Sequence, residues 1–363
     1  MRLLIVSHSN TPWTPLYARW LVAAGHAVQV VSMSPDPIAG VPLRFIGVEP
    51  FDKRRNKHLF VTRVPAVRRI IRESAPDLVF ATYVISNGLL AALAWRGPLA
   101  VSAQGGDVRP LHRPGDWRNA IRDRIVGYVC RRAAVVHAVS QPLADALVAL
   151  GTPREKLLVA ASGIELNRFS PAPEAPRPVA RRIISIRKHE PIYDIPTLVE
   201  ALARLAARGR DFSAELVGGG YLLEAHRELV ERRGLSERVQ VVGAVPHESL
   251  AERLRAGDVY VTTARADGTS ASLLEGMASG LFPVATRIPA NTAWLEEGRT
   301  GLLFEPSDPG ALAAALERAL DDAELRRAAF DENRRRVMRD GDLNRNMRAL
   351  EARFAAAIAE RGR

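Results

Sequence analysis

The stretch Val259–Ala285, VYVTTARADGTSASLLEGMASGLFPVA, contains a complete strand–helix–strand repeat. Val259–Thr262 and Pro283–Ala285 are short apolar runs of the kind that form buried strands, and Thr269 or Ser270 is placed to cap the helix between them. Two strands joined by a helix run parallel, because the chain must cross over before it re-enters the sheet. The stretch therefore predicts a parallel sheet covered by helices.

The same alternation of apolar strands and amphipathic helices extends in both directions along the chain. Strands are expected at Leu3–Ser7, Ala27–Ser32, Leu43–Val48, Leu78–Thr82, Leu99–Ala103, Val135–Val139, Leu157–Ala161, Ile183–Ile186, Ala214–Val217, Val239–Val242 and Gly301–Phe304 as well. A Pro-rich stretch, Ser170–Pro178, interrupts the alternation. We predict an α/β chain with two doubly wound, Rossmann-like domains, 1–168 and 169–342. A last helix within 343–363, at about Leu343–Glu360, is expected to pack back on the first domain.

The composition is that of a soluble globular protein, with 47% hydrophobic and 25% charged residues in a chain of 363. No apolar run reaches the ~18–20 residues that a membrane-spanning helix needs, and Met1–Val6 is too short for the apolar part of a secretion signal. We therefore expect a cytoplasmic protein. Cys130 is the single cysteine, which excludes an internal disulfide and any multi-cysteine metal site.

The net charge of +11 lies in the first half of the chain. Residues 1–172 contain 22 Lys and Arg against 11 Asp and Glu, whereas residues 173–363 contain 29 of each kind. The densest basic segments are Lys53–Lys57 with Arg63, Arg68, Arg69 and Arg72, and Arg113–Arg132. Either these are solvated faces or they meet an anionic partner. Nucleic acid is not expected, because no aromatics interleave with the basic runs. An anionic surface at the inner face of the cell membrane fits the charge better.

Ligands of doubly wound sheets bind beyond the carboxyl ends of the strands, so the residues that follow each strand are candidates for a site. In the second domain these segments are Arg187–Lys188, Gly218–Gly220, Gly243–His247, Ala264–Thr269 and Arg287–Asn291. They are Gly-rich, polar and cationic, which suits an anionic ligand that also carries hydroxyl groups. The helix that follows Asp267–Thr269 presents backbone N–H groups to an anion such as a diphosphate.

Two acids flank the start of that helix, Asp267 in front of it and Glu275 within it. A carboxylate that accepts hydrogen bonds from sugar hydroxyls gains roughly 1.5 to 3 kcal/mol per bond. We expect the two acids to hold opposite ends of a sugar nucleotide. The alternative is that Asp267 is a helix-cap residue and Glu275 an exposed surface residue.

The ordered set of motifs resembles the retaining glycosyltransferases of family 4, which have the GT-B fold. The resemblance covers nearly the whole chain and is far more specific than any one motif. It rests on Arg187, Gly218–Gly220, Gly243, Asp267–Gly280, Pro283 and Gly301–Pro306 in the second half, and on Gln104–Asp107, Ser140–Leu143 and Gly163–Pro171 in the first. The family pattern has two Glu residues, and here Asp267 takes the place of the first, which leaves the sugar preference open.

Residue by residue, the resemblance implies the following donor site. Glu275 holds the ribose hydroxyls, and Asp267, with the backbone of Gly268, Thr269 and Ser270, meets the transferred sugar. The diphosphate is implied to lie against Arg187, the amides near Ser272 and Leu273, and the loop Gly218, Gly219 and Gly220, for which a plain tight turn is the alternative.

A lysine that follows the diphosphate-binding arginine in the family is absent here, and Tyr193 stands in its place. Charge stabilisation of the leaving group is then expected to rest on Arg187, on Lys188 and on the helix N-terminus. Pro191–Tyr193 and Ile288–Asn291 are similar to the pattern of a branch of the same family, so the change is interpreted as a variant. His247 is expected near the nucleotide base or as a surface residue.

The first domain is expected to face the acceptor. His8, Asn10 and Trp13 follow the first strand and are available for sugar contacts, with packing on their own domain as the alternative. Gln104 and Gly105 fall where many family members have His and Gly, and glutamine cannot act as an acid or base. Asp107 is a candidate for orienting the donor sugar, or a turn residue after two glycines.

The resemblance implies transfer of a sugar from a nucleotide-diphosphate donor, UDP- or GDP-linked, to a hydroxyl acceptor with retained configuration. A lipid-linked or cell-envelope glycan precursor is the acceptor considered. No cofactor and no metal are expected, because cationic side chains can neutralise the diphosphate. Alanine at Glu275 or Arg187 is expected to lower transfer at least tenfold without changing Tm. A sugar-nucleotide epimerase or hydrolase of the same fold, a binding-only relic and, least, a nicotinamide enzyme are the alternatives.

Overall fold

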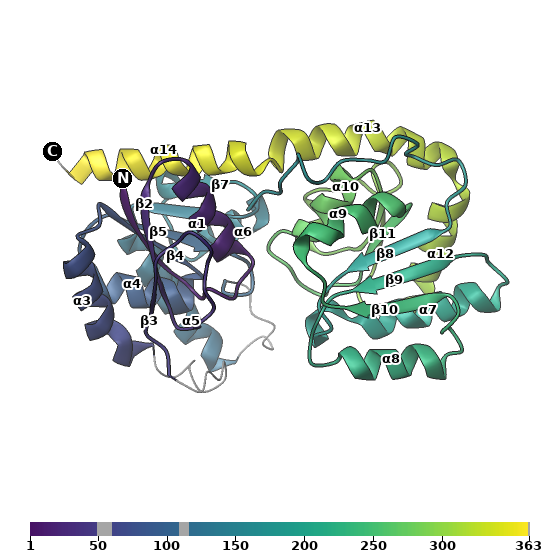
Figure 1. Cartoon of the computed structure of the whole chain (residues 1–363), viewed down its shortest axis with the longest axis horizontal. Coiled ribbons are helices and arrows are strands. Elements are labelled where there is room, and N and C mark those ends of the chain that lie inside the picture. Colours follow the sequence, from purple (N-terminus) through teal and green to yellow (C-terminus); the bar gives the residue numbers. More distant parts are fainter. Residues whose placement is uncertain (49–59, 109–115, 362–363) are drawn as a thin grey trace. The chain divides into compact units, whose positions relative to one another are not determined.

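The computed structural model describes residues 1–48, 60–108 and 116–361 (Figure 1). Their contacts divide the chain into two compact units, Met1–Ser162 with Asn344–Arg363, and Gly163–Leu343. The division falls before Gly163, whereas the sequence suggested residue 168. The difference arises because Ile164 is bonded to the end of the second unit. Its N–H donates to the Gly341 carbonyl (2.9 Å) and its carbonyl accepts from the Leu343 N–H (3.1 Å).

The first unit is built on seven parallel strands in the order β3-β2-β1-β4-β5-β6-β7. The strands are β1 (Arg2–Val6), β2 (Ala27–Ser32), β3 (Leu43–Phe45), β4 (Leu78–Thr82), β5 (Leu99–Ala103), β6 (Val135–Ala138) and β7 (Leu157–Val159). The helices are α1 (Trp13–Ala23), η1 (Val61–Arg63), α3 (Val64–Ser74), η2 (Val84–Gly88), α4 (Leu89–Ala94), α5 (Trp117–Arg132), α6 (Gln141–Ala149) and η3 (Arg154–Lys156). Every residue of β4 and β5 is buried, as expected for apolar strands covered on both faces.

The second unit repeats this plan with six parallel strands in the order β10-β9-β8-β11-β12-β13. The strands are β8 (Arg182–Ile186), β9 (Ser213–Val217), β10 (Val239–Gly243), β11 (Val259–Thr262), β12 (Phe282–Thr286) and β13 (Leu302–Phe304). The helices are η4 (Pro191–Tyr193), α7 (Ile195–Ala207), α8 (Leu223–Arg232), α9 (His247–Ala256), α10 (Ala271–Ala278), α11 (Pro289–Thr292), α12 (Pro309–Asp321) and α13 (Ala323–Asp340). The predicted α/β class with two Rossmann-like sheets is confirmed.

The strand order changes direction once in each sheet, between β1 and β4 in the first and between β8 and β11 in the second. Ligands of doubly wound sheets bind beside such a point, because the neighbouring crossovers leave on opposite faces and open a crevice at the carboxyl ends. In the second unit the segments that start there are Arg187–Lys188 after β8 and Thr263–Ser270 after β11. The strand order therefore brings two of the expected site segments to one point.

The last helix, α14 (Leu343–Arg361), is assigned to the first unit from Asn344 onward. Phe354 is fully buried there, with its ring 5.1 Å from that of Phe80 in β4. His26 Nε2 lies 2.6 Å from Glu351 Oε1. These contacts fix the helix against the first sheet.

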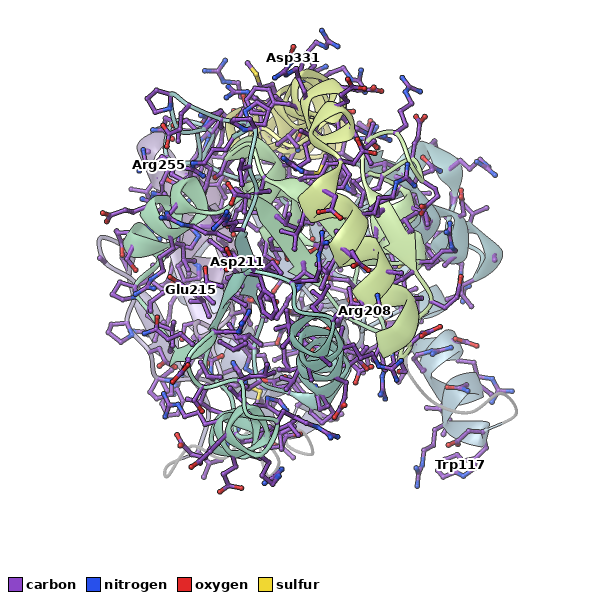
Figure 2. All side chains as sticks on the ribbon, turned by 90° about the vertical axis from the view of Figure 1, so that its right-hand side faces the viewer. Trp117, Arg208, Asp211, Glu215, Arg255 and Asp331 are labelled. Atoms are coloured by element: carbon purple, nitrogen blue, oxygen red, sulfur yellow. The ribbon has the colours of Figure 1, made fainter. Side chains whose placement is uncertain are left out.

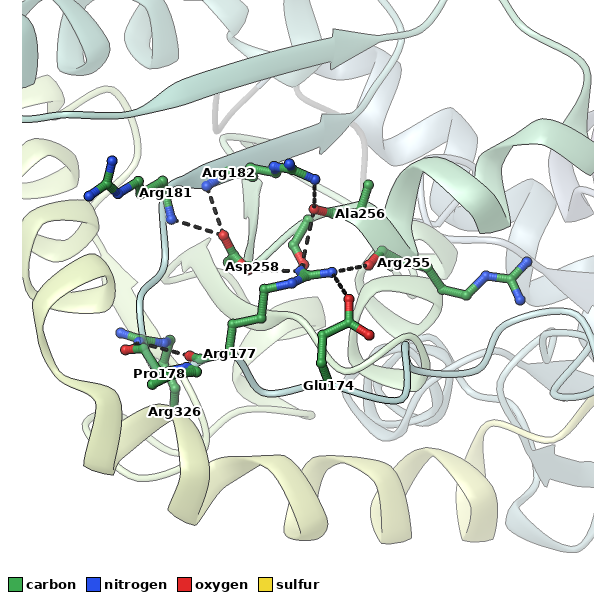
Figure 3. Close-up of polar contacts among 10 residues, drawn as sticks. Glu174, Arg177, Pro178, Arg181, Arg182, Arg255, Ala256, Asp258 and Arg326 are labelled. Atoms are coloured by element: carbon green, nitrogen blue, oxygen red, sulfur yellow. Dashed lines mark hydrogen bonds and ion pairs between the residues drawn. The ribbon is translucent and has the colours of Figure 1, made fainter.

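Arginine side chains fasten the segment that leads into the second sheet (Figure 3). Arg177 donates to Asp258 Oδ1 (3.0 Å), and Asp258 Oδ2 accepts the backbone N–H groups of Arg181 and Arg182 (2.8 and 2.9 Å). Arg326, which is only 3% exposed, donates to the Arg177 carbonyl (3.2 Å). These bonds hold the start of β8, whose other end carries Arg187.

Candidate functional site

Arg187 joins three segments at the point where the second sheet changes direction. Its Nε donates to Thr262 Oγ1 at the end of β11 (2.9 Å), and its Nη1 is 3.1 Å from Asp267 Oδ2. A second terminal nitrogen, Nη2, donates to Ser270 Oγ at the start of α10. With 8% exposure the guanidinium is buried, so these bonds replace the water that it loses. The sequence predicted Arg187, Asp267 and Ser270 as site residues. It did not predict that Thr262 contacts Arg187, nor that Asp267 and Arg187 pair with one another.

The charge of Arg187 is secured by its surroundings. Burial by itself lowers the pKa of the guanidinium, but Tyr260 and Asp267 more than offset this effect, and the pKa lies above its ordinary value. The Tyr193 ring centre lies 5.2 Å from the guanidinium carbon, a cation–π contact. Tyr193 therefore supports Arg187 with its ring face. Because Tyr193 stands where the family pattern has a lysine, this position adds no second positive charge to the site.

Helix α10 begins as predicted, with Ser270 as its N-cap. Ser270 Oγ accepts the Leu273 N–H (3.2 Å), and Ser272 Oγ lies 2.8 Å from the Tyr260 hydroxyl. The Leu273 amide, expected to meet a diphosphate, is thus occupied by the cap. The amides of Ala271 and Ser272 have no acceptor among the described residues, as is normal for the first turn of a helix. The open donors of α10 therefore lie directly beside the Arg187 charge.

Glu275 is buried, at 7% exposure, which contradicts the alternative of an exposed surface acid. His247, the first residue of α9, holds it: His247 Nε2 is 3.2 Å from Glu275 Oε1, and Arg168 Nη1 is 2.8 Å from His247 Nδ1. A guanidinium only donates, so in the neutral imidazole Nδ1 accepts from Arg168 and Nε2–H donates to Glu275. The bond to Glu275 raises the pKa of His247, against the opposite effect of burial. His247 is therefore a partner of the ribose-binding candidate.

The loop Gly218–Gly220 is Gly-rich because the chain approaches itself there. A Cβ on Gly218 would lie 2.1 Å from the Arg187 carbonyl oxygen, and one on Gly220 would lie 2.4 Å from that of His189. Both glycines have φ near +150°. The Gly218 N–H donates to the Gly243 carbonyl (2.8 Å). The loop thus holds the Arg187 backbone in place. Lys188 is exposed, and its side chain makes no hydrogen bond or ion pair with a described residue, although its carbonyl accepts the Glu190 N–H (2.9 Å).

In the first unit, Asp107 ties a loop to β5. Its Oδ1 accepts the backbone N–H groups of Gln104 (3.0 Å) and Gly105 (2.9 Å), and its Oδ2 accepts that of Val84 (2.7 Å). Burial raises the pKa of Asp107, and the amide bonds oppose that rise. These contacts match the turn role that the sequence left open for Asp107, and they hold Gln104 at the carboxyl end of β5.

A buried hydrogen-bond chain that the sequence did not reveal orients the Gln104 side chain. Gln104 Nε2 donates to Ser102 Oγ (2.7 Å), Ser102 Oγ lies 2.8 Å from His137 Nδ1, and His137 Nε2 lies 2.8 Å from the Ala160 carbonyl. The carbonyl can only accept, so Nε2 carries the proton and Nδ1 accepts from Ser102. Burial lowers the pKa of His137 to about 4, so the imidazole is neutral near pH 7.

The loop after β1 keeps both of its proposed roles. The His8 ring packs edge-on against Phe60 at 6.0 Å, Asn10 is exposed, and Trp13 is half-buried at the start of α1. Asn10 and Trp13 therefore remain open to a ligand, whereas His8 also packs on its own unit.

The sequence also missed Asp194, which follows Tyr193 and joins three segments of the second unit. Asp194 Oδ2 accepts from Thr197 (2.9 Å), Arg265 (3.1 Å) and Ser307 (2.8 Å). Its φ of +47° at the start of α7 is uncommon for a residue other than glycine. The sequence signal that could have indicated this role is the spacing of Asp194 and Thr197, an acid three residues before a threonine at the start of a helix.

In residues 1–48, 60–108 and 116–361, no three His, Cys, Asp or Glu side chains are grouped to hold a metal ion. Over the same residues, no helix has the length and apolar character needed to cross a bilayer.

Both halves of the chain match known families. Residues 180–322 match the family model described as glycosyl transferases group 1, and residues 16–168 match that of glycosyltransferase family 4. The chain is 27% identical over 362 residues to the D-inositol 3-phosphate glycosyltransferase of Geodermatophilus obscurus, over 91% of this chain and 78% of that protein.

Solved structures share the fold. Sucrose-phosphate synthase from Thermosynechococcus elongatus superposes with a TM-score of 0.84 at 18% identity, over 99% of this chain and 100% of that chain. Anabaena HepE in complex with UDP gives 0.78 at 18% identity, over 98% and 100%.

Proposed function

The chain is a family-4-like glycosyltransferase of the GT-B fold, and we propose that it moves a sugar from a nucleotide-diphosphate donor to a hydroxyl acceptor with retained anomeric configuration. The observation that carries the donor proposal is the buried Arg187 guanidinium beside the open amides of α10. A fixed positive charge and unpaired N–H groups together form an anion site. The UDP bound to HepE supports a nucleotide diphosphate as that anion.

In this proposal the donor lies along α10. The diphosphate meets Arg187 and the amides of Ala271 and Ser272, Glu275 holds the ribose hydroxyls beside His247, and Asp267 with Gly268 and Thr269 meets the transferred sugar. Asp267 is already paired with Arg187, so the incoming phosphate shares the guanidinium with it. The guanidinium therefore has an anionic partner both before and after the donor binds.

The chemical step exchanges one bond at the anomeric carbon. The carbon–oxygen bond to the diphosphate breaks, the acceptor oxygen bonds to the same face, and the acceptor proton passes to the departing phosphate oxygen. Arg187 and the α10 amides stabilise the charge that develops there, an effect worth roughly 2.7 to 4 kcal/mol per well-placed donor in acyl-transfer enzymes. The proposal requires no metal and no cofactor, because the guanidinium supplies the positive charge.

The acceptor is proposed to be a lipid-linked or cell-envelope glycan precursor at an anionic membrane surface. The excess of basic residues in the first half of the chain supports this choice. Gln104, held by Ser102, and the loop with Asn10 and Trp13 are the polar groups of that half proposed to face the acceptor.

A thermal-shift panel of UDP, GDP, ADP and their sugars tests the donor site. A nucleotide at 100 times its Kd stabilises the protein by about 2.7 kcal/mol, which raises Tm by a few degrees. Glu275→Gln should abolish that rise, whereas Glu248→Gln, at an exposed position of α9, should keep it. If no nucleotide diphosphate raises Tm, the donor proposal is wrong.

Product analysis then tests the reaction with the donor that binds. We expect a glycoside with the donor's anomeric configuration by NMR, with unchanged rates in a chelator. An inverted product contradicts retention, and loss of activity in the chelator contradicts the metal-free proposal. Free or epimerised sugar formed without an acceptor would favour the hydrolase or epimerase alternative.

A further inference from the structure

Helix α5 (Trp117–Arg132) exposes large apolar side chains along one line. Trp117 is 67% exposed, Ile121 46% and Tyr128 41%. Their spacings of four and seven residues place them on the same face of a helix. In Figure 2, the Trp117 side chain extends outward from the end of its helix.

The opposite face of α5 is already used by the core. Val126, Val129 and Cys130 are fully buried in the hydrophobic core of the first unit. Packing of this unit therefore explains one face of the helix and leaves the other unexplained. Contiguous exposed apolar side chains of this size mark an interaction surface, because a helix face that meets only water is normally polar.

Two arginines complete the exposed line. Arg124 and Arg131 follow Trp117 by seven and fourteen residues, and both are exposed. Asp123, the one acid within α5, is paired with Arg122 at 2.6 Å. The exposed face of Trp117, Ile121, Arg124, Tyr128 and Arg131, hereafter the α5 stripe, therefore combines apolar and positively charged groups with no acid.

The other basic segments noted in the sequence are weaker candidates for a surface that meets an anionic partner. Lys53–Lys57 and Arg113 lie outside the described residues. Arg68 donates to the Leu93 carbonyl (2.9 Å), and Arg69 lies 3.7 Å from Glu73. Part of the charge of α3 is thus paired within the unit, whereas Arg124 and Arg131 form no ion pair with any residue that the structure describes.

We propose that the α5 stripe lies on an anionic bilayer surface. A helix in the membrane interface buries an apolar face in the headgroup region while its basic side chains meet lipid phosphates. Trp and Tyr favour this depth, because their rings are apolar and their N–H and O–H groups reach water. The inference rests on the proposed function only in that the membrane would present the acceptor.

The size of the effect follows from the charges. Each basic residue near an anionic membrane contributes about 1 kcal/mol, so loss of Arg124 and Arg131 should weaken binding by about 30-fold. Replacing Trp117 and Ile121 by serine removes the two most exposed apolar side chains of the α5 stripe and should weaken binding by at least tenfold. All four residues are exposed, so neither variant should alter Tm by more than a degree or two.

Vesicle co-sedimentation of the full chain tests the proposal. The wild type should bind vesicles of phosphatidylcholine with 40% phosphatidylglycerol, and release at high salt. Trp117→Ser/Ile121→Ser and Arg124→Gln/Arg131→Gln should each lose binding. Arg19→Gln/Arg96→Gln is the matched charge control on two other exposed arginines and should change it far less.

Equal binding to pure phosphatidylcholine, or equal loss in the control variant, would overturn the assignment. A stripe variant that still binds the anionic vesicles would also overturn it. The same is true of a stripe variant that loses self-association in light scattering, because the stripe would then be a contact between copies of the chain. Sugar transfer to a soluble acceptor should be unchanged in the stripe variants, and Arg187→Met should bind vesicles normally. Failure of donor transfer and failure of membrane binding are therefore distinguishable.

Discussion

Replacing Arg187 by methionine should separate its structural role from its catalytic one. The change removes the ion pair with Asp267, which is intermediate between an exposed and a buried pair and is worth about 2 kcal/mol. It also removes one hydrogen bond from each of the buried hydroxyls of Thr262 and Ser270, at about 1 kcal/mol each. We expect the free energy of unfolding to fall by about 4 kcal/mol. The expectation from sequence that Tm stays constant is therefore withdrawn for Arg187.

Transfer should fall further than stability alone explains. Loss of the guanidinium should lower kcat by about 10²- to 10³-fold per folded molecule, because a charge next to the leaving diphosphate disappears. Urea unfolding monitored by circular dichroism gives the folded fraction, and initial rates give kcat. Leu205→Ala, in the core of α7, is a comparably destabilised control that should keep its kcat. Wild-type kcat per folded Arg187→Met molecule would refute the catalytic assignment.

Three further predictions concern titration and backbone packing. NMR titration of His247 should give a pKa above the ordinary 6.5, and this pKa should fall in Glu275→Gln. The stabilisation from the His247–Glu275 pair is fully present below pH 6.5 and is lost as the pH rises through the raised pKa of His247. Because burial lowers the pKa of His137 to about 4, His137 takes up a proton at a higher pH in the unfolded chain than in the folded protein. Stability should drop by up to about 3 kcal/mol between pH 6.5 and 4, and a His137→Gln variant that retains this drop would contradict the assignment. Gly218→Ala should lower the free energy of unfolding by more than about 2 kcal/mol, because the new Cβ would lie 2.1 Å from a carbonyl oxygen. Gly106→Ala is the control: its Cβ would meet open space, so the free energy of unfolding in the same urea assay should change by less than about 0.5 kcal/mol.

Local sequence predicted the fold because the signals that set it are local. The apolar runs of β4 and β11, and the cap at Ser270, depend on neighbours a few residues away. The same holds for Arg187 and Glu275 as candidates, since Arg187 follows a predicted strand and Glu275 lies within a predicted helix.

Partners of these residues could not be predicted, because they come from distant parts of the chain. His247 reaches Glu275 across 28 positions, and Ser102 reaches His137 across 35. The use of the Leu273 amide by its own helix cap, and the close approach of Gly218 to the Arg187 backbone, also depend on the packed structure.

The sequence by itself determined two parallel α/β sheets and the residues that end their strands, because strand, helix and cap preferences act over short distances. Only the tertiary structure decided which of those residues pair, that Arg187 is shared by Asp267, Thr262 and Ser270, and which face of α5 is left open to solvent. Those outcomes depend on strand order and packing, which bring distant segments within hydrogen-bond reach and bury some side chains while exposing others.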